Sequence, residues 1–289
     1  MRWRNISMVL ALGACTPLAP DPVVPSFDLG EYYRAAEAEI RANGGMRTEY
    51  APADAIFSRE DLARNFMRIA MYDEFNTVDG RYAASETPSN LRKYERPVRV
   101  RVVNGAATTQ ADQNLNNQLV AQYTRRLARI TGLDMRLANE EERANMIVFF
   151  LNKAEQPRMA RQLGRYITAP PREVENAFAN SPNDMLCGAF SLSSERAPYS
   201  YTASVILIKS EHSGAQRAAC VSEEMAQALG LTNDSPEARP SIFNDDEEFA
   251  ALTVHDEFLL RILYSARLKS GMSAAEVQPL LADIISEIW

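Results

Sequence analysis

The sequence predicts an α+β fold built around a mixed sheet. Between about residues 96 and 210, short runs with strand-like apolar patterns follow one another and are interrupted by a single long amphipathic helix pattern. From residue 211 onward, three segments with helical spacing close the chain. Apolar residues make up 46% and charged residues 24% of the 289 residues, which is enough to form a sizeable buried core.

The N-terminal third has helical patterns. Residues 31–42 ("EYYRAAEAEIRA") have helical spacing and stop at Asn-Gly-Gly. Residues 58–75 open with a Ser58-x-x-Asp61 capping box, which satisfies free backbone N–H groups where a helix starts. Residues 76–90 are polar and rich in turn formers, so they predict a loop. We therefore expect a helical N-terminal region over 31–95.

A second region is predicted over 96–289. Its first strand, 97–105 ("PVRVRVVNG"), alternates strictly, and the helix 111–132 has one apolar face and stops at Gly132. The remaining elements follow in order: strands near 134–137, 146–151, 187–193 and 201–210, then helices at 213–230, 253–271 and 273–289.

The first 30 residues indicate export and lipid anchoring. "MRWRN" is a basic leader and residues 6–14 are apolar, a run of about nine residues that is too short to span a bilayer. "LGAC", Leu12–Cys15, resembles a bacterial lipobox, so 1–14 is predicted to be a lipoprotein signal peptide and Cys15 the lipidated residue. A plain secretory signal is the alternative. Residues 16–30 contain four prolines, and we expect an extended tether over 15–30.

This prediction sets the location and one partner. The chain is expected in the bacterial cell envelope, facing the periplasm, with the membrane bound through the lipid on Cys15. Thr16 follows the cysteine, where lipoproteins retained in the inner membrane usually carry Asp. The outer membrane is therefore favoured over the inner one.

The two other cysteines, Cys187 and Cys220, form an even pair in an exported chain. A disulfide between them is predicted, and closing a loop of about 34 residues stabilises a fold by roughly 3–4 kcal/mol in the chain-entropy model. Two free buried thiols are the first alternative, and a Cys/His nucleophile pair is the second.

The net charge of −7 is unevenly distributed. Residues 91–172 hold 15 basic and 7 acidic residues, and residues 211–289 hold 14 acidic and 5 basic ones. This asymmetry favours charged partners, such as an envelope protein or polymer. Nucleic acid is not predicted because the basic residues are scattered, and nucleotide is not predicted because no glycine-rich phosphate loop is present.

Histidine is scarce, which restricts the possible chemistry. His212 and His255 are the only two in the chain, so a three-histidine zinc site is excluded and a Ser-His-Asp triad would have to use one of them. We expect His212 in a loop after a strand and His255 on the surface of a helix. The acidic run 245–248 is expected to be a solvated loop.

One motif combines several polar side chains at a meaningful spacing. Residues 223–233 read "EEMAQALGLTN", or EExxQxxGxxN. Glu223 and Gln227 are separated by about one helical turn, close enough to bind one ion or one water together. Gly230 would end the helix, and Asn233 would follow on a return turn. An ordinary solvated helix followed by a turn is the alternative.

This motif and two later segments, 241–264 and 267–272, resemble a family of proteobacterial lipoproteins, domain of unknown function 2927, over about residues 96–289. More distantly, the arrangement is similar to that of metzincin metalloproteases. In that family the motif HExxHxxGxxH is followed by a turn that contains methionine and then by a last helix. The resemblance implies a zincin-like fold in which Glu223, Gln227 and Asn233 occupy the zinc-ligand positions and Glu224 occupies the general-base position.

By the same resemblance, Ser241 to Phe243 would form the turn that usually contains Met, with Phe243 at the Met position. Leu252-Thr253 to Asp256 and Leu263-Tyr264 would match the last helix, and Thr253-x-x-Asp256 is also a capping box. All three histidine ligands and the methionine are replaced.

Glu, Gln and Asn offer only oxygen ligands, which suit Ca²⁺, Mg²⁺ or Mn²⁺ better than Zn²⁺. We therefore expect no cofactor; an oxygen-liganded divalent cation, with Asp234 or Asp245 added, is the alternative. Three functions are compatible with these patterns. The first is an envelope protein with a degenerate zincin-like domain and a binding or structural role. The second is a metal-dependent hydrolase with Glu224 as general base. The third is an interaction protein that acts through its charged surfaces.

Overall fold

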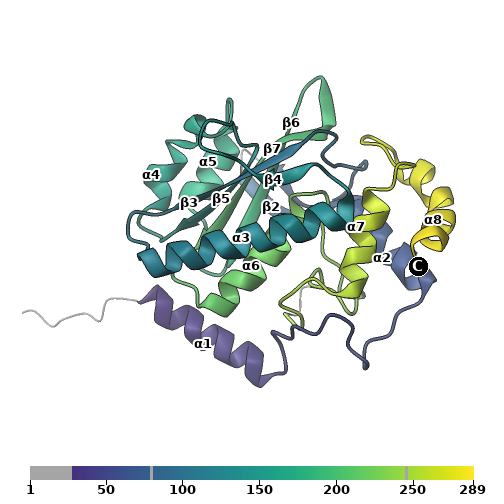
Figure 1. Cartoon of the computed structure of the whole chain (residues 1–289), viewed down its shortest axis with the longest axis horizontal. Helices are drawn as coiled ribbons and strands as arrows, with labels where there is room; N and C mark the ends of the chain where they lie inside the picture. The colour runs from purple at the N-terminus through teal and green to yellow at the C-terminus, as the bar shows by residue number, and fades with distance from the viewer. Residues whose placement is uncertain (1–27, 79–80, 245–246) are drawn as a thin grey trace, which may run out of the picture.

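The computed structural model describes residues 28–78, 81–244 and 247–289. Its centre is a mixed five-stranded sheet in the order β4-β3-β5-β7-β6 (Figure 1). Four strands run parallel: β3 (Val98–Asn104), β4 (Met135–Leu137), β5 (Met146–Leu151) and β7 (Ala197–Lys209). The edge strand β6 (Cys187–Ser194) is antiparallel to β7. The α+β class with a mixed sheet is confirmed.

Helices cover both faces of this sheet. One face packs against α3 (Gln110–Thr131) and α6 (Gly214–Gln227), which share one large apolar cluster with strand residues such as Val148 and Ile206. The other face packs against α4 (Gln156–Ala160), the 3-10 turn Leu163–Arg165 and α5 (Arg172–Ala179) through strand residues such as Phe149 and Leu207. Every residue of β5 is buried, because β5 has helices on both faces, and this explains its uninterrupted apolar run.

The predicted elements of the second region are present. Gly132 ends α3 in the left-handed conformation, as its place after the apolar pattern predicted. The helix predicted over 253–271 is shorter and ends at Leu263, and the last helix, α8, spans Ala274–Ile288. The helices α4 and α5 have no counterpart among the predicted elements.

The N-terminal region differs from the prediction at the start of α1, at the end of α2 and in the segment that follows α2. Helix α1 (Leu29–Ala42) starts inside the predicted tether, because Asp28 caps it by accepting from the backbone N–H groups of Gly30 and Glu31. Helix α2 (Arg59–Ala70) starts at the predicted capping box but ends five residues early. The chain then forms β1 (Tyr72–Val78) and β2 (Arg81–Pro88), an antiparallel pair, so the predicted loop over 76–90 is wrong.

The sequence does contain a hairpin signal at this place. Asp79-Gly80 lies between the two strands, and this dipeptide is typical of tight hairpin turns. Both residues are outside the described part of the chain. The polar composition of the two segments obscures this signal.

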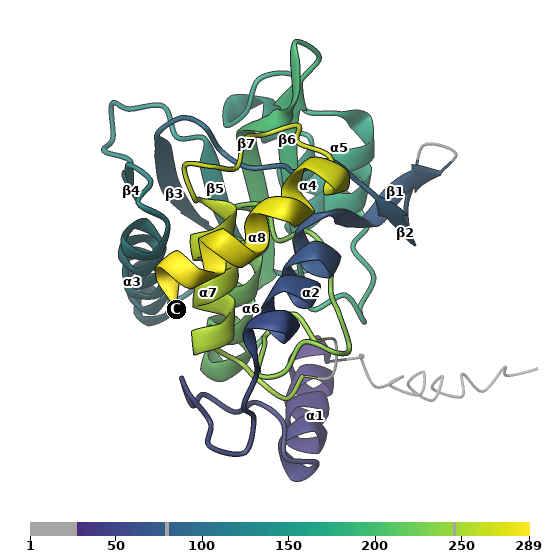
Figure 2. The ribbon, with the colours of Figure 1, turned by 90° about the vertical axis from the view of Figure 1, so that its right-hand side faces the viewer.

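Helix α2 packs against α7 (Val254–Leu263) and α8, as the second view shows (Figure 2). Its buried residues Leu62 and Phe66 belong to the same apolar cluster as Leu259 and Leu260 of α7. The cluster therefore includes residues from both sides of the boundary predicted at 95/96; the division itself stays a prediction.

The predicted signal peptide 1–14, Cys15 and most of the tether lie outside the described residues. Within the described part, no helix combines the length and the apolar character that crossing a membrane requires.

Candidate functional site

Helix α6 carries the motif, and two features fix its position. Ser213 caps the helix by accepting from the Gln216 N–H, directly after the turn that leaves β7. The Cys187–Cys220 disulfide then joins α6 to the edge strand β6, with a Cα–Cα distance of 5.8 Å. The predicted disulfide is confirmed, and it holds the helix against the sheet.

The carboxylates at the end of α6 are not on a solvated surface. Glu224 is only 4% exposed, and its Oε2 atom has no hydrogen-bond partner within the described residues. Glu223 and Gln227 are half-buried. α6 lies among α3, β6 and β7, which argues against the interpretation of the motif as an ordinary solvated helix.

Gly230 makes the turn after α6, and only glycine fits there. Its φ is +124°, a region that other residues rarely adopt. A Cβ atom at this position would lie 2.1 Å from the carbonyl oxygen of Arg92. The chain therefore turns sharply beneath a neighbouring backbone segment, as the position of this glycine in the motif implied.

The return turn after Gly230 forms hydrogen bonds with α2 and β1, which together are called the N-terminal layer. The backbone N–H groups of Thr232 and Asn233 both donate to the Ile69 carbonyl at 3.1 Å, and the Thr232 hydroxyl donates to the Tyr72 carbonyl at 2.7 Å. The Asn233 side-chain amide donates to the carbonyl oxygens of Arg68 (3.1 Å) and Asp234 (2.9 Å). The end of α2 and the start of β1 thus occupy the hydrogen-bonding groups of this turn.

The acids around the end of α6 make proton loss unfavourable. Burial, followed by the neighbouring Glu224 and Asp234 carboxylates, raises the pKa of Glu223 well above its ordinary value. Burial, followed by Asp234 and Glu74, does the same to the pKa of Glu224. Each of these two carboxyl groups therefore binds its proton more tightly than an isolated glutamate does.

The described residues do not form a metal centre of the usual kind. No group of three or more His, Cys, Asp and Glu side chains in 28–78, 81–244 and 247–289 is placed to hold an ion. Asp245, one of the two residues considered as an additional ligand, lies outside these ranges.

The turn before α7 is built on Asp256. One carboxylate oxygen accepts from the Ser241 hydroxyl at 2.5 Å, and the other accepts from the backbone N–H groups of Ile242 (3.2 Å) and Thr253 (2.8 Å). The predicted Thr253–Asp256 capping box is confirmed. Phe243 is fully buried, so this turn anchors the core beneath α6.

Tyr264 connects α7 to the return turn. Its hydroxyl donates to the Leu229 carbonyl at 2.8 Å, one residue before Gly230. Next to it, the buried Lys93 ammonium donates to the carbonyl oxygens of Leu263 (3.0 Å) and Leu268 (2.8 Å), and burial lowers the pKa of Lys93 to about 8. The role of Lys93 could not be predicted, because its sequence neighbours carry charges typical of a surface segment.

The two histidines are both in the interior. His255 is fully buried, with its ring nitrogen Nε2 3.1 Å from the Asn65 amide, so the predicted surface position is wrong. Helix α2 covers the face of α7 that carries it. His212 follows β7 in a turn, as predicted, but burial lowers its pKa to about 4 and its Nε2 lies 2.7 Å from the Leu186 carbonyl.

The acidic run is not simply a solvated loop. Glu248 forms ion pairs of 2.7 Å with Arg47 and with Arg239. Both arginines also pair with Asp54, so this part of the run belongs to a network that ties the segment after α1 to the loop before α7.

Comparison with known proteins identifies a family but no activity. The model of a family described as protein of unknown function (DUF2927) matches residues 59–283. No curated protein and no solved structure matches the chain. The match begins at the first residue of α2, so it includes the layer that bonds to the return turn.

Proposed function

We propose that this chain, which belongs to the DUF2927 family, is a lipid-anchored cell-envelope protein whose zincin-like domain has no peptidase activity. The end of α6 and its return turn then have a structural role: they join the sheet, α7 and the N-terminal layer. A zincin-like arrangement is supported by the order of the parts, with α6 followed by a glycine turn, the turn at 241–243 and α7 with Tyr264 against Leu229.

The hydrogen bonds of the return turn are the main observation that supports the proposal. A third metal ligand has to reach the ligands on the helix, whereas the Asn233 side chain is held towards the end of α2, because its amide nitrogen donates to the carbonyl oxygens of Arg68 and Asp234. A general base has to reach water and substrate, but Glu224 is 4% exposed. Both observations support a structural role for this region rather than peptide hydrolysis.

The absence of peptidase activity is tested on the full-length chain purified in mild detergent. Element analysis and digestion of a mixed peptide library, each with added Zn²⁺, Ca²⁺, Mg²⁺ or Mn²⁺, should give neither stoichiometric metal nor cleavage. A bound metal that is lost in Gln227→Leu, together with cleavage that is lost in Glu224→Gln, would overturn the proposal.

A metal-dependent hydrolase is the second candidate. The group of carboxylates around Glu223 and Glu224 favours it, because their mutual repulsion would be relieved by a cation. This candidate requires α2 and β1 to move away from the return turn. The same experiment separates it from the first candidate.

The anchor is tested by fractionating bacteria that express the full chain with its leader. The wild type should be found in the outer membrane, and Cys15→Ser should be lost from the membrane fraction. Thr16→Asp should shift the chain towards the inner membrane. Membrane recovery of Cys15→Ser equal to that of the wild type would contradict lipid anchoring.

A further inference from the structure

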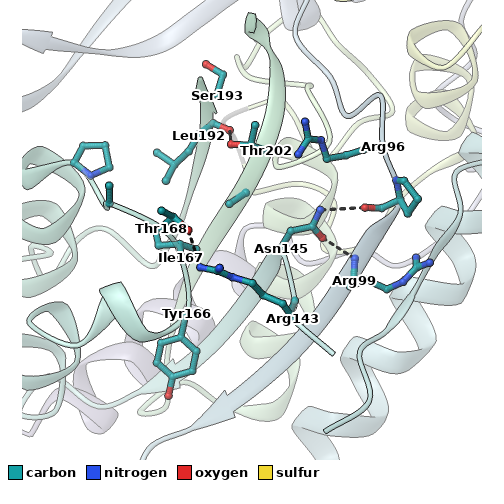
Figure 3. A pocket seen from close by; sticks show the side chains of 15 residues that line it. Arg96, Arg99, Arg143, Asn145, Tyr166, Ile167, Thr168, Leu192, Ser193 and Thr202 are labelled. Carbon is teal, nitrogen blue, oxygen red and sulfur yellow. Dashed lines mark hydrogen bonds between the residues drawn. The ribbon is translucent and has the colours of Figure 1, made fainter. Parts of the chain in front are cut away.

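A pocket of about 450 Å³ lies at the opposite end of the sheet strands from the carboxyl ends of β3 and β5 (Figure 3). It is formed where β3 and β5 begin, by the segment after the 3-10 turn, and by the half of the β6–β7 pair that lies nearer its hairpin connection. A volume of this size is in the range of small-molecule sites.

The pocket has a strong excess of positive charge. Arg96, Arg99 and Arg143 line it, and no Asp or Glu is among its lining residues. Arg99 is neutralised by ion pairs with Asp134 (2.7 Å) and Glu142 (3.0 Å). Within the described residues, Arg96 and Arg143 form no ion pair, although the chain as a whole carries a net charge of −7.

These two arginines are placed on loops that are fixed to each other. The Asn145 side chain accepts from the Arg99 N–H at 2.7 Å and donates to the Pro97 carbonyl at 3.0 Å, which joins the two loops across the pocket (Figure 3). The Arg143 guanidinium donates to the Thr168 hydroxyl at 2.7 Å, so it is held against the pocket wall. The Arg143 guanidinium and the backbone next to Arg96 are thus positioned before any ligand binds.

The rest of the wall offers both hydroxyl groups and apolar surface. Thr168, Ser193 and Thr202 contribute hydroxyl groups, of which those of Ser193 and Thr202 donate to the carbonyl oxygens of Pro198 and Leu192. The apolar part comes from Pro97, Ile167, Leu192 and Ala203. The β6–β7 pairing is irregular between Leu192 and Ser193, and such bulges often re-aim side chains beside a site.

From these features, we infer that the pocket binds a small organic dianion, with Arg96 and Arg143 as its cationic contacts. Two unneutralised guanidinium groups in a concave site match a ligand with about two negative charges, because the planar guanidinium binds two oxygens of a carboxylate or phosphate group through paired hydrogen bonds. The apolar wall accepts the carbon part of the ligand. A phosphate monoester and a dicarboxylate share this chemistry. The inference does not depend on the proposed envelope role.

Calorimetric titration of the purified full chain at low ionic strength tests the inference. Phenyl phosphate and glutarate are the two probes, and Arg125→Gln, which replaces an exposed arginine on α3 outside the pocket, is the matched control. At least one probe should bind, with affinity reduced tenfold or more in Arg96→Gln and in Arg143→Gln and unchanged in Arg125→Gln. Binding of phenyl phosphate would identify the charged group of the ligand as a phosphate, and binding of glutarate would identify it as a pair of carboxylates.

Two results would overturn the inference: no binding of either probe at 10 mM (roughly the upper limit of a weak specific site), or binding that persists in both pocket variants. A second measurement guards against misfolded variants. Bound ligand should protect Arg143 of the wild-type chain from modification by phenylglyoxal, while Arg125 stays equally reactive; modification of both at unchanged rates would also overturn it.

Discussion

The end of α6 and the arginine pocket are both rich in ionisable side chains, but these side chains differ in their exposure to solvent. At the end of α6, like charges are buried together, and Glu224 is 4% exposed beneath the N-terminal layer. In the pocket, Arg96 and Arg143 are exposed and open to solvent. Buried like charges destabilise a fold unless they take up protons, whereas exposed unpaired charges cost little and attract ligands.

This difference shows that polar side chains at a regular spacing are not always exposed to solvent. The motif groups several polar side chains around one turn, yet the tertiary packing buries Glu224 and engages Asn233 in hydrogen bonds with the backbone. The pocket has no recognisable motif, yet its groups remain available. We therefore expect substitutions in the first region to change stability and substitutions in the second to change binding.

The largest effect is expected at the return turn. Gly230→Ala should destabilise the fold by about 4 kcal/mol or more, because it combines backbone strain with a clash against the Arg92 carbonyl. Gly132→Ala is the matched control: its φ is +71°, but a Cβ there meets nothing within 4 Å, so about 1–2 kcal/mol is expected. Urea unfolding measures both. Equal losses would mean that the turn is not tightly packed.

The second-largest loss of stability is expected when the disulfide is removed. The double variant Cys187→Ser/Cys220→Ser should lose about 3–4 kcal/mol of unfolding free energy, since the bond restricts the unfolded chain. Hydrogen exchange should rise in α6 and β6, while the first residues of β3 and β5 beside the arginine pocket stay protected. Wild-type protein treated with reductant serves as the control and should match the variant. Uniformly faster exchange would argue against a local effect.

Glu224→Gln should stabilise the protein at neutral pH by about 1–2 kcal/mol, the size expected for relieving one poorly satisfied buried polar group. The folded-state pKa of Glu224 is raised above its unfolded value, so the folded chain binds more protons. Wild-type stability should therefore fall as pH rises from about the ordinary glutamate pKa through the raised one, and this slope should flatten in the variant. Unfolding at several pH values measures it.

Glu195→Gln is the control for this experiment, because Glu195 is an exposed acid in the connection between β6 and β7. Its stability and pH slope should match those of the wild type. If Glu224→Gln were destabilising at neutral pH, the Glu224 carboxylate would have to be ionised and engaged in a favourable contact, contrary to the closed site described above.

The smallest effect on stability is expected in the pocket. Arg143→Gln should change the unfolding free energy by less than about 0.5 kcal/mol, since it removes one exposed hydrogen bond to Thr168. The same variant should lose ligand binding. A large destabilisation would show that the pocket arginines hold the fold together, as the α6 region does, and the contrast between the two regions would disappear.

Much of the fold could be predicted from local patterns. The alternation in β3, the continuous apolar run of β5 and the stop of α3 at Gly132 each follow from short-range periodicity and backbone preference. The segment that forms the hairpin β1–β2 predicts a loop instead, because its polar composition obscures the Asp79-Gly80 turn signal. The interior position of His255 depends on α2, which is far away in the sequence.

The candidate site also has features that the sequence predicted and features that it could not predict. Spacing alone placed Glu223 and Gln227 about one turn apart and put the turn at Gly230, and the cysteine count predicted the bond between Cys187 and Cys220. Spacing says nothing about what covers a helix. The contacts of Asn233 with the end of α2 joined two segments more than a hundred residues apart.

The sequence by itself therefore determined most helices and the strands of the main sheet, their order, the disulfide and the family, because these depend on neighbouring residues and on residue counts. Only the tertiary structure decided which charges are buried and which are open. That outcome depends on how distant segments pack: α2 and β1 close over the end of α6, while the loops that carry Arg96 and Arg143 meet around Asn145 and leave a pocket between them.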